Sequence, residues 1–150
     1  MKRAMVAAAA AAVATGAVLA RGGDAETGPA TIRITELQTE FRRVDAGATG
    51  RIGDVEVLRQ RLYNQRVSQR PIGNAYLVCT FLDRRTRLCN GTYVLPRGKI
   101  VVAGTLDSRL LYEVAIVGGT GLYDNARGAL TVTSTSLRPR RDVLLFRLAG

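Results

Sequence analysis

Four glycines, at positions 118, 119, 121 and 128, crowd a short stretch near the end of this 150-residue chain. A dinucleotide-binding loop, Gly-x-Gly-x-x-Gly, needs its third glycine where a helix begins. Counted from Gly119 and Gly121, that position holds Asp124. Residues 129–135, which follow, are an alternating run rich in β-branched side chains, a pattern typical of a strand. We therefore predict a sharp corner between two strands, where Gly118, Gly119, Gly121 and Gly128 supply positive φ or close backbone approach.

The rest of the chain beyond residue 30 also has strand character. No segment there has a convincing apolar stripe at helical spacing, although residues 57–63 could instead form one and a half helical turns. Short antiparallel strands with short links predict an all-β barrel or sandwich. A closed barrel of eight strands would leave no free edge and could hold one small ligand. The eight predicted strands cover residues 31–41, 54–63, 75–82, 87–95, 99–105, 109–117, 129–137 and 142–148.

The N-terminal residues resemble a secretory signal peptide. Lys2 and Arg3 precede an uncharged, alanine-rich run over residues 4–20, and we predict cleavage after Ala20. A buried helix or a retained membrane anchor is the alternative, although the run is short for a membrane span. We thus expect a secreted or cell-envelope protein with a signal peptide over residues 1–20, a flexible tail over 21–30 and one domain over 31–150.

The net charge of +10 raises the question of an acidic partner. Only Lys2 and Lys99 are lysine, and the many arginines are scattered along the chain, as a GC-rich genome would produce. The sequence has no recognition-helix pattern and no aromatic RNA-stacking motif. We therefore expect no nucleic-acid partner, and contact with an anionic surface stays open as an alternative.

Cys79 and Cys89 are the only cysteines. In an exported protein two cysteines usually pair, and a hairpin centred on Arg84 would place them directly opposite each other. So short a closed loop would contribute roughly 2–3 kcal/mol in the chain-entropy description. A free, reactive Cys79 is the alternative. Without histidine, two cysteines cannot complete a tetrahedral metal site, so we expect no metal.

Strand alternation places Cys79 and Cys89 on one face with Leu77, Phe81 and Tyr93, which we interpret as a barrel lining with ligand-contacting side chains. Because there is no histidine, carboxylates and tyrosines would have to polarise a ligand oxygen. The Tyr93 hydroxyl is a candidate, although the pattern favours a core tyrosine bonded to the backbone, because core aromatic residues outnumber catalytic ones. The other candidate side chains are Glu40, Glu113, Asp124, Tyr76, Tyr112 and Tyr123.

Glu113, Asp124 and Asn125 also have structural interpretations. An inward Glu113 would need a partner such as Arg127, whereas an outward Glu113 would be an ordinary surface residue. Asp124 and Asn125 suit a turn at the glycine corner.

Several motifs occur in an order that resembles the allene oxide cyclase/dirigent superfamily. They are Gly53-Asp54, Leu62-Tyr63, the strand around Cys79, Gly98, Gly104 and the glycine corner from Val117 to Gly128. The resemblance implies an eight-stranded antiparallel barrel with an apolar central cavity, often assembled as a homotrimer. It also implies cofactor-independent cyclisation, or stereochemical guidance of a phenolic molecule.

The resemblance also suggests site residues. Cys79 is similar to a cysteine near the cyclase cavity, and Tyr93 to a cavity tyrosine. Glu40 lies near the position of a charge-stabilising glutamate, but Arg42 and Arg43 replace the asparagine-containing stretch that the cyclases carry. We predict Tyr93 and Glu40 as catalytic candidates.

The sequence thus favours an exported barrel that binds a small apolar or phenolic molecule, without a cofactor, and that guides its cyclisation, isomerisation or coupling. A carrier without turnover and an envelope-associated interaction protein with a basic exterior are the alternatives.

Overall fold

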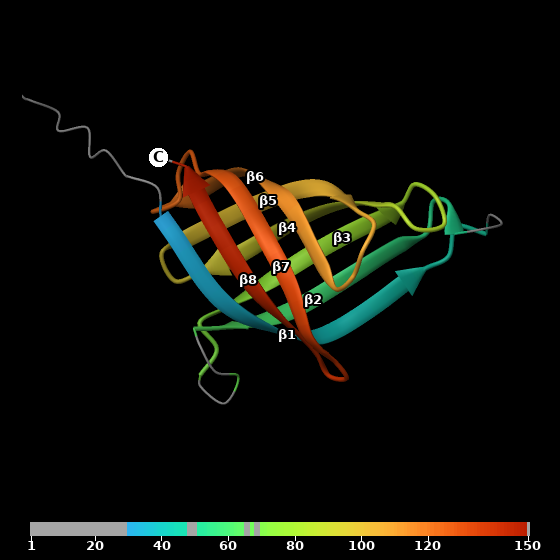
Figure 1. Cartoon of the computed structure of the whole chain (residues 1–150), viewed down its shortest axis with the longest axis horizontal. Coiled ribbons are helices and arrows are strands. Elements are labelled where there is room, and N and C mark those ends of the chain that lie inside the picture. The colour runs from blue at the N-terminus through green and yellow to red at the C-terminus, as the bar shows by residue number, and fades with distance from the viewer. Residues whose placement is uncertain (1–29, 48–50, 65–66, 68–69, 150) are drawn as a thin grey trace, which may run out of the picture.

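The computed structural model describes residues 30–47, 51–64, 67 and 70–149. The predicted signal peptide and residues 21–29 of the predicted tail lie outside the described residues. Eight strands form one closed barrel in which each strand pairs antiparallel with the next and β8 pairs with β1 (Figure 1). The strands are β1 (Ala30–Val44), β2 (Val55–Tyr63), β3 (Gly73–Phe81), β4 (Arg87–Leu95), β5 (Gly98–Leu106), β6 (Leu111–Gly121), β7 (Arg127–Leu137) and β8 (Arg140–Ala149).

The predicted all-β barrel is confirmed. The alternative fold, a sandwich, is not adopted. Residues 57–63 belong to β2, so the helical alternative does not apply. Strand β1 already begins at Ala30, the last residue of the predicted tail.

Alternation along each strand separates an inner from an outer face. On β3 and β4 the inner side chains are apolar, except Arg87 at the start of β4, and include Ala75, Leu77, Phe81 and Tyr93, as the sequence predicted. They pack with inward residues of the other strands, such as Ile100, Leu130 and Phe146, all fully buried. Removing this apolar surface from water is the main force that holds a barrel of this kind closed.

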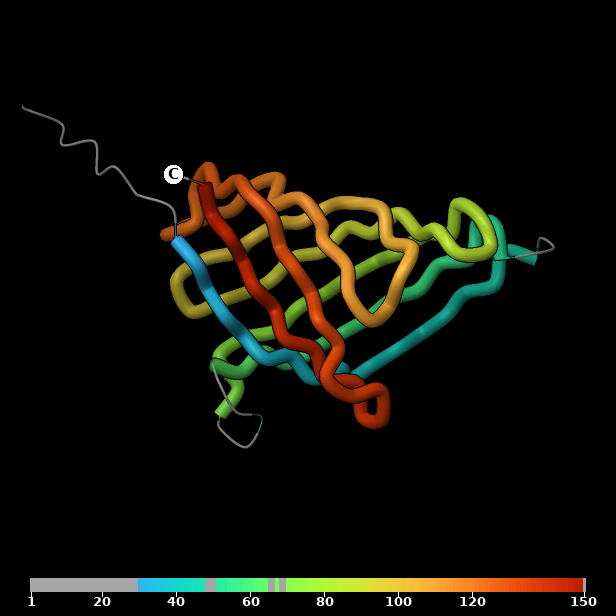
Figure 2. The backbone as a smooth tube through the Cα atoms, in the orientation of Figure 1, coloured from blue at the N-terminus to red at the C-terminus, as the bar shows by residue number. Residues whose placement is uncertain are grey.

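The two ends of the barrel differ. One end, here the Arg97 end, carries the β4–β5 turn, the glycine corner, the start of β1 and the end of β8 (Figure 2). The other end, here the Arg109 end, carries the β3–β4 and β5–β6 loops and the β7–β8 turn. Among the described residues, no helix is long and apolar enough to cross a membrane.

The glycine corner joins β6 to β7 as predicted. Gly121 and Gly128 have φ of 67° and 130°, and Asn125, a turn residue, has φ of 59°. A Cβ on Gly119 would lie 2.0 Å from the carbonyl oxygen of Tyr123, so this position needs glycine for close approach. Gly118 differs, because a Cβ there would meet no atom of the described chain within 4 Å.

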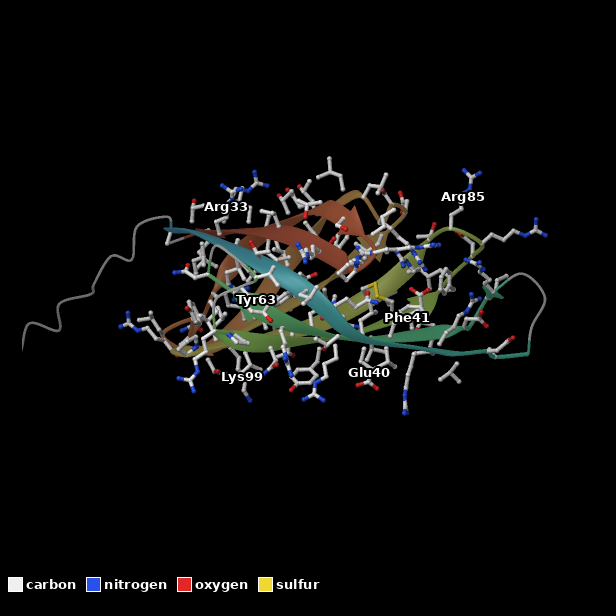
Figure 3. All side chains as sticks on the ribbon, turned by 90° about the horizontal axis from the view of Figure 1, so that it is seen from below. Arg33, Glu40, Phe41, Tyr63, Arg85 and Lys99 are labelled. Carbon is white, nitrogen blue, oxygen red and sulfur yellow. A yellow bond between two sulfur atoms is a disulfide. The ribbon has the colours of Figure 1, made fainter. Side chains whose placement is uncertain are left out.

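The disulfide between Cys79 and Cys89 is present, with the two residues directly opposed and their Cα atoms 4.0 Å apart. Both cysteines are buried, and the bond lies across the inner face of β3 and β4 (Figure 3).

Candidate functional site

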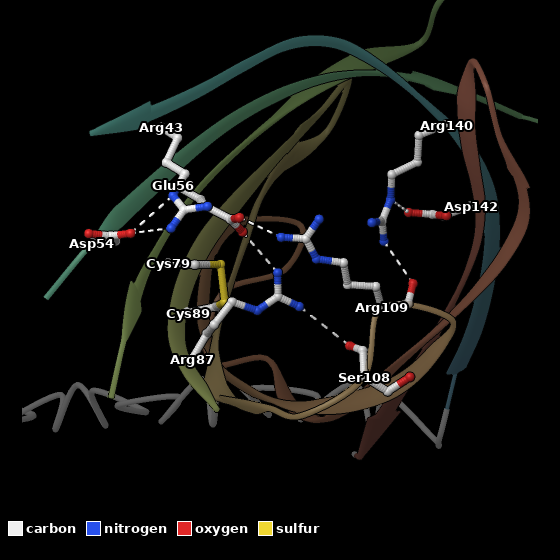
Figure 4. Close-up of polar contacts among 10 residues, drawn as sticks. All are labelled: Arg43, Asp54, Glu56, Cys79, Arg87, Cys89, Ser108, Arg109, Arg140 and Asp142. Carbon is white, nitrogen blue, oxygen red and sulfur yellow. Dashed lines mark hydrogen bonds and ion pairs between the residues drawn. A yellow bond between two sulfur atoms is a disulfide. The ribbon is translucent and has the colours of Figure 1, made fainter. Parts of the chain in front are cut away.

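Two carboxyl groups face each other inside the barrel. Glu36 of β1 and Asp142 of β8 are directly opposed across the strand pair, and each is almost fully buried, at 2% and 1% exposure. We call them the acid pair. Arg140, two residues before Asp142, donates from Nε to Asp142 Oδ2 at 2.8 Å (Figure 4). One arginine therefore balances one of the two carboxyls, and burying a second uncompensated negative charge would be costly.

The environment of Glu36 favours its neutral form. Burial raises the pKa of Glu36 well above its ordinary value, and the charge and hydrogen bonding of Asp142 raise it further, against the opposing charge of Arg140. Burial alone would lower the pKa of Arg140, but the hydrogen bond and the charge of Asp142 raise it. The pair thus combines a carboxylic acid that can give up a proton with a carboxylate that an arginine holds, an arrangement suited to acid–base chemistry.

Two tyrosine hydroxyls belong to the same region. Burial, followed by the charge of Glu36, raises the pKa values of both Tyr93 and Tyr112, so both remain neutral hydroxyl groups. The Tyr93 ring, 1% exposed, meets the Phe146 ring edge to face with centroids 5.1 Å apart. Tyr93 therefore offers a fixed hydroxyl in an apolar setting, whether as a core residue or as a catalytic one.

A second buried carboxylate lies nearer the Arg109 end. Glu56, 1% exposed, accepts a hydrogen bond from Arg87 Nη1 at 2.9 Å and pairs with Arg109 of the β5–β6 loop. Arg87 also reaches the carbonyl oxygen of Ser108 at 3.5 Å, and Arg140 donates to that of Arg109 at 3.1 Å (Figure 4). The charged side chains thereby fasten the β5–β6 loop across this end of the barrel.

The space beside the acid pair is small. A cavity of about 20 Å³, which we call the small cavity, is bordered by polar and apolar side chains. A larger space of about 460 Å³, which we call the end hollow, opens at the Arg97 end. Its lining residues include Ile32, Tyr123, Ala126 and Leu148. The small cavity is lined by Leu58, Gln60, Leu77, Cys79, Arg87, Leu106, Tyr112, Arg140 and Asp142.

An inner apolar layer separates the two spaces. Ile34 and Leu144 are paired between the levels of Ile32 and Glu36, Phe146 is paired with Ile32 itself, and all three are at most 2% exposed. Four residues of strand correspond to roughly 13 Å. The resemblance implied an apolar central cavity, whereas the cavity that Arg140 and Asp142 line has a volume of only about 20 Å³.

The candidate residues from the sequence fall into separate places. Leu77, Phe81 and Tyr93 line the interior. Glu40 lies on the outer surface, half exposed and paired with Arg42 at 3.3 Å, and points away from the barrel in Figure 3. A β-bulge between Gln38 and Glu40 shifts the register by one residue, which turns Glu40 outward although it shares the parity of Glu36.

The remaining candidates are mostly outside the barrel. Glu113 faces outward and pairs with Arg147 rather than Arg127. Tyr76 is exposed beneath the guanidinium of Arg59, 5.5 Å from its ring centre. Asp124 belongs to the glycine corner, and Tyr123 lines the end hollow.

Glu36, Asp142 and Arg140 were missed by sequence reasoning. Glu36 carries a usable signal, because it shares the parity of Ile32 and Ile34 on β1 and so belongs to their inner face. Asp142 carries none, since residues 143–146 are apolar without alternation and do not reveal which face is inside. The described residues contain no group of three or more metal-ligating side chains placed to hold a metal ion.

Comparisons with known proteins identify the fold. No protein-family profile matches the sequence, and no curated protein matches it either. A pyocyanin demethylase is 24% identical with a TM-score of 0.66, over 78% of this chain and 100% of that one. A pterocarpan synthase dirigent protein is 16% identical, with a TM-score of 0.64 over 80% and 85% of the two chains. An exo-specific intermolecular Diels-Alderase is 15% identical, with a TM-score of 0.63 over 82% and 99%.

At these identities the likeness concerns architecture. The chain has the barrel fold of the dirigent and cyclase-like proteins, which confirms the fold that the resemblance predicted.

Proposed function

We propose that this barrel binds a small apolar or phenolic molecule and promotes its cyclisation, isomerisation or stereoselective coupling, with the acid pair as the proton donor and acceptor. The observation that carries the proposal is the buried Glu36 opposite Asp142 and Arg140, beside the hydroxyls of Tyr93 and Tyr112. A neutral acid in a water-poor chamber is the group that can polarise a ligand oxygen without a cofactor. The barrels named above include a dirigent protein and a Diels-Alderase, which support this class of chemistry.

In the proposed reaction Glu36 transfers its proton to a carbonyl or quinone-methide oxygen of the ligand. The electrophile so formed is attacked by a hydroxyl or carbon nucleophile of the same or a second ligand molecule. The proton released by the nucleophile returns to the acid pair, at Glu36 directly or by way of Asp142. No net proton, electron or cofactor is consumed, and the walls of the barrel fix the face of attack.

Access to the acid pair sets a condition on this chemistry. The end hollow is large enough for a small ligand, whereas the small cavity is not. Turnover at Glu36 therefore requires the layer of Ile34, Leu144 and Phe146 to part when the ligand enters. Carriage of a ligand in the end hollow requires no such movement, so a carrier without turnover is the second candidate function.

Export is part of the proposal. It rests on the signal-like residues 1–20, and the Cys79–Cys89 disulfide supports it because such bonds persist in oxidising compartments.

The deciding experiment uses matched carboxyl variants. Purified barrel is incubated with a panel of phenolic quinone methides, without an oxidant, and chiral chromatography measures the stereoselectivity and rate of product formation. Glu36→Gln should lower the guided rate about 100-fold or more, since it removes the acidic proton but keeps the side-chain shape. The control, Glu113→Gln, changes an outward carboxyl and should leave the rate unchanged.

Native mass spectrometry of protein isolated from its own host measures binding separately, through any co-purified small molecule. Equal rates for wild type and Glu36→Gln, with a ligand retained by both, would overturn the catalytic proposal and leave the carrier.

A further inference from the structure

Several buried polar atoms near the acid pair have no hydrogen-bond partner among the described residues. They are Gln60 Oε1, Arg87 Nε and Asp142 Oδ1, together with Glu36 Oε2. Gln60, Arg87 and Asp142 are 4%, 6% and 1% exposed, so bulk water does not reach them. Buried polar groups in folded proteins are almost always satisfied, by protein or by an ordered water.

Three of the four unsatisfied groups share one cavity. Gln60 of β2, Arg87 of β4 and Asp142 of β8 all line the small cavity, although they come from three different parts of the barrel. Its volume of about 20 Å³ exceeds the roughly 10–15 Å³ that one water molecule needs. The polar lining is also unlike that of an apolar cavity, which would stay dry.

The hydrogen-bonding capacity of these groups selects the occupant. Arg87 Nε offers one donor, whereas Gln60 Oε1 and Asp142 Oδ1 offer two acceptors. A water molecule accepts one hydrogen bond and donates two, which matches this set. A chloride ion could accept from Arg87 but could donate to neither oxygen, and a cation would face the guanidiniums of Arg87 and Arg140.

We propose that the small cavity binds a single structural water molecule that accepts a hydrogen bond from Arg87 and donates to Gln60 and Asp142. The site itself depends only on the cavity and its lining. The role of this water rests on the proposed function. The water donates a hydrogen bond to Oδ1 of Asp142 and thereby gives the acid pair a route for exchanging its proton.

The structure also indicates how this water is retained. Arg87 and Arg140 line the cavity and at the same time hold the carbonyl groups of Ser108 and Arg109 in the β5–β6 loop. The fastened loop lies at the Arg109 end of the barrel. We therefore expect the water to exchange slowly compared with the tumbling of the protein.

The test combines a high-resolution crystal structure of the barrel with water-¹⁷O magnetic relaxation dispersion, which counts long-lived internal waters. The wild type should show a water within hydrogen-bond distance of all three side chains. Gln60→Leu should lose this density, and its count of long-lived waters should fall by one. Asn90→Leu, the same kind of change on the outer face of β4, should leave the count as in the wild type.

Three results would overturn the site: a dry cavity in the wild type, an ion in place of water, or an unchanged count in Gln60→Leu. These outcomes are independent of ligand turnover. If the water is present but Glu36→Gln retains full activity, the water site stands and the catalytic part of the proposed function is overturned.

Discussion

Burial of Glu36 beside a second carboxyl ties the stability of the barrel to pH. Its folded pKa lies above the value of about 4.3 that glutamate has in an unfolded chain. The protonated side chain therefore contributes its full stability below that pH. This contribution is lost as the pH rises toward the folded pKa, because the unfolded chain releases the proton first.

Glu36→Gln should remove this pH dependence, since an amide keeps a hydrogen-bond donor toward Asp142 but does not ionise. We expect the variant to gain stability relative to the wild type as the pH rises from 4 to 8, because only the wild type loses the contribution of its protonated side chain. Urea unfolding of both proteins from pH 4 to pH 8 measures this difference in the free energy of unfolding. A constant difference between the two proteins across that range would contradict the neutral state of Glu36.

At the scale of elements, the glycine corner offers a matched pair of substitutions. In Gly119→Ala the new methyl group would collide with the carbonyl oxygens of Tyr123 and Lys99, at 2.0 and 2.8 Å. We expect a loss of about 3 kcal/mol in the free energy of unfolding, because the backbone atoms it meets cannot move aside without disturbing the sheet. Gly118→Ala, one residue away, should change stability by less than about 1 kcal/mol. Equal effects in urea unfolding would contradict the assignment of Gly119 as the close-approach position.

The β3–β4 hairpin makes a second prediction at this scale. Replacing Cys79 and Cys89 together by alanine should lower the free energy of unfolding by about 2–3 kcal/mol, because the short closed loop no longer restricts the unfolded chain. Titration of the non-reduced protein should find no free thiol, and two reactive thiols would contradict the disulfide.

The strands were predictable because residues that alternate between water and a core carry a period of two in the sequence. The hairpin of Cys79 and Cys89 and the glycine corner follow from that pattern and from turn chemistry. Glu40 shows the limit of this pattern, since one bulge at residue 39 reverses the facing of the rest of β1, and a bulge has no sequence signal of its own here. The acid pair was not predicted for a related reason. Glu36 and Asp142 come together only because β8 pairs with β1, and the sequence does not show this pairing.

At the scale of the whole molecule, the outer face of β2 and β3 exposes several large apolar side chains. Val57, Tyr76 and Val78 are 40–46% exposed there. The resemblance in sequence implies a homotrimer, and we propose that this face is buried in it.

Native mass spectrometry should give three times the chain mass, and Val78→Asp should give monomers, because an uncompensated charge would enter the interface. Val117→Asp on β6, at a residue of similar exposure, is the control and should stay assembled. A monomeric wild type would contradict the assembly, and dissociation of both variants would contradict this choice of face.

Strand β1 closes the ring, because its first half pairs with β8 and its second half with β2. The seam therefore joins β1 to β8, and it cannot form until the ribosome has delivered β8. Contacts so distant in sequence make for slow folding. A polypeptide that lacked β8 would expose two unpaired edges, on β1 and on β7, and such edges invite association with other chains.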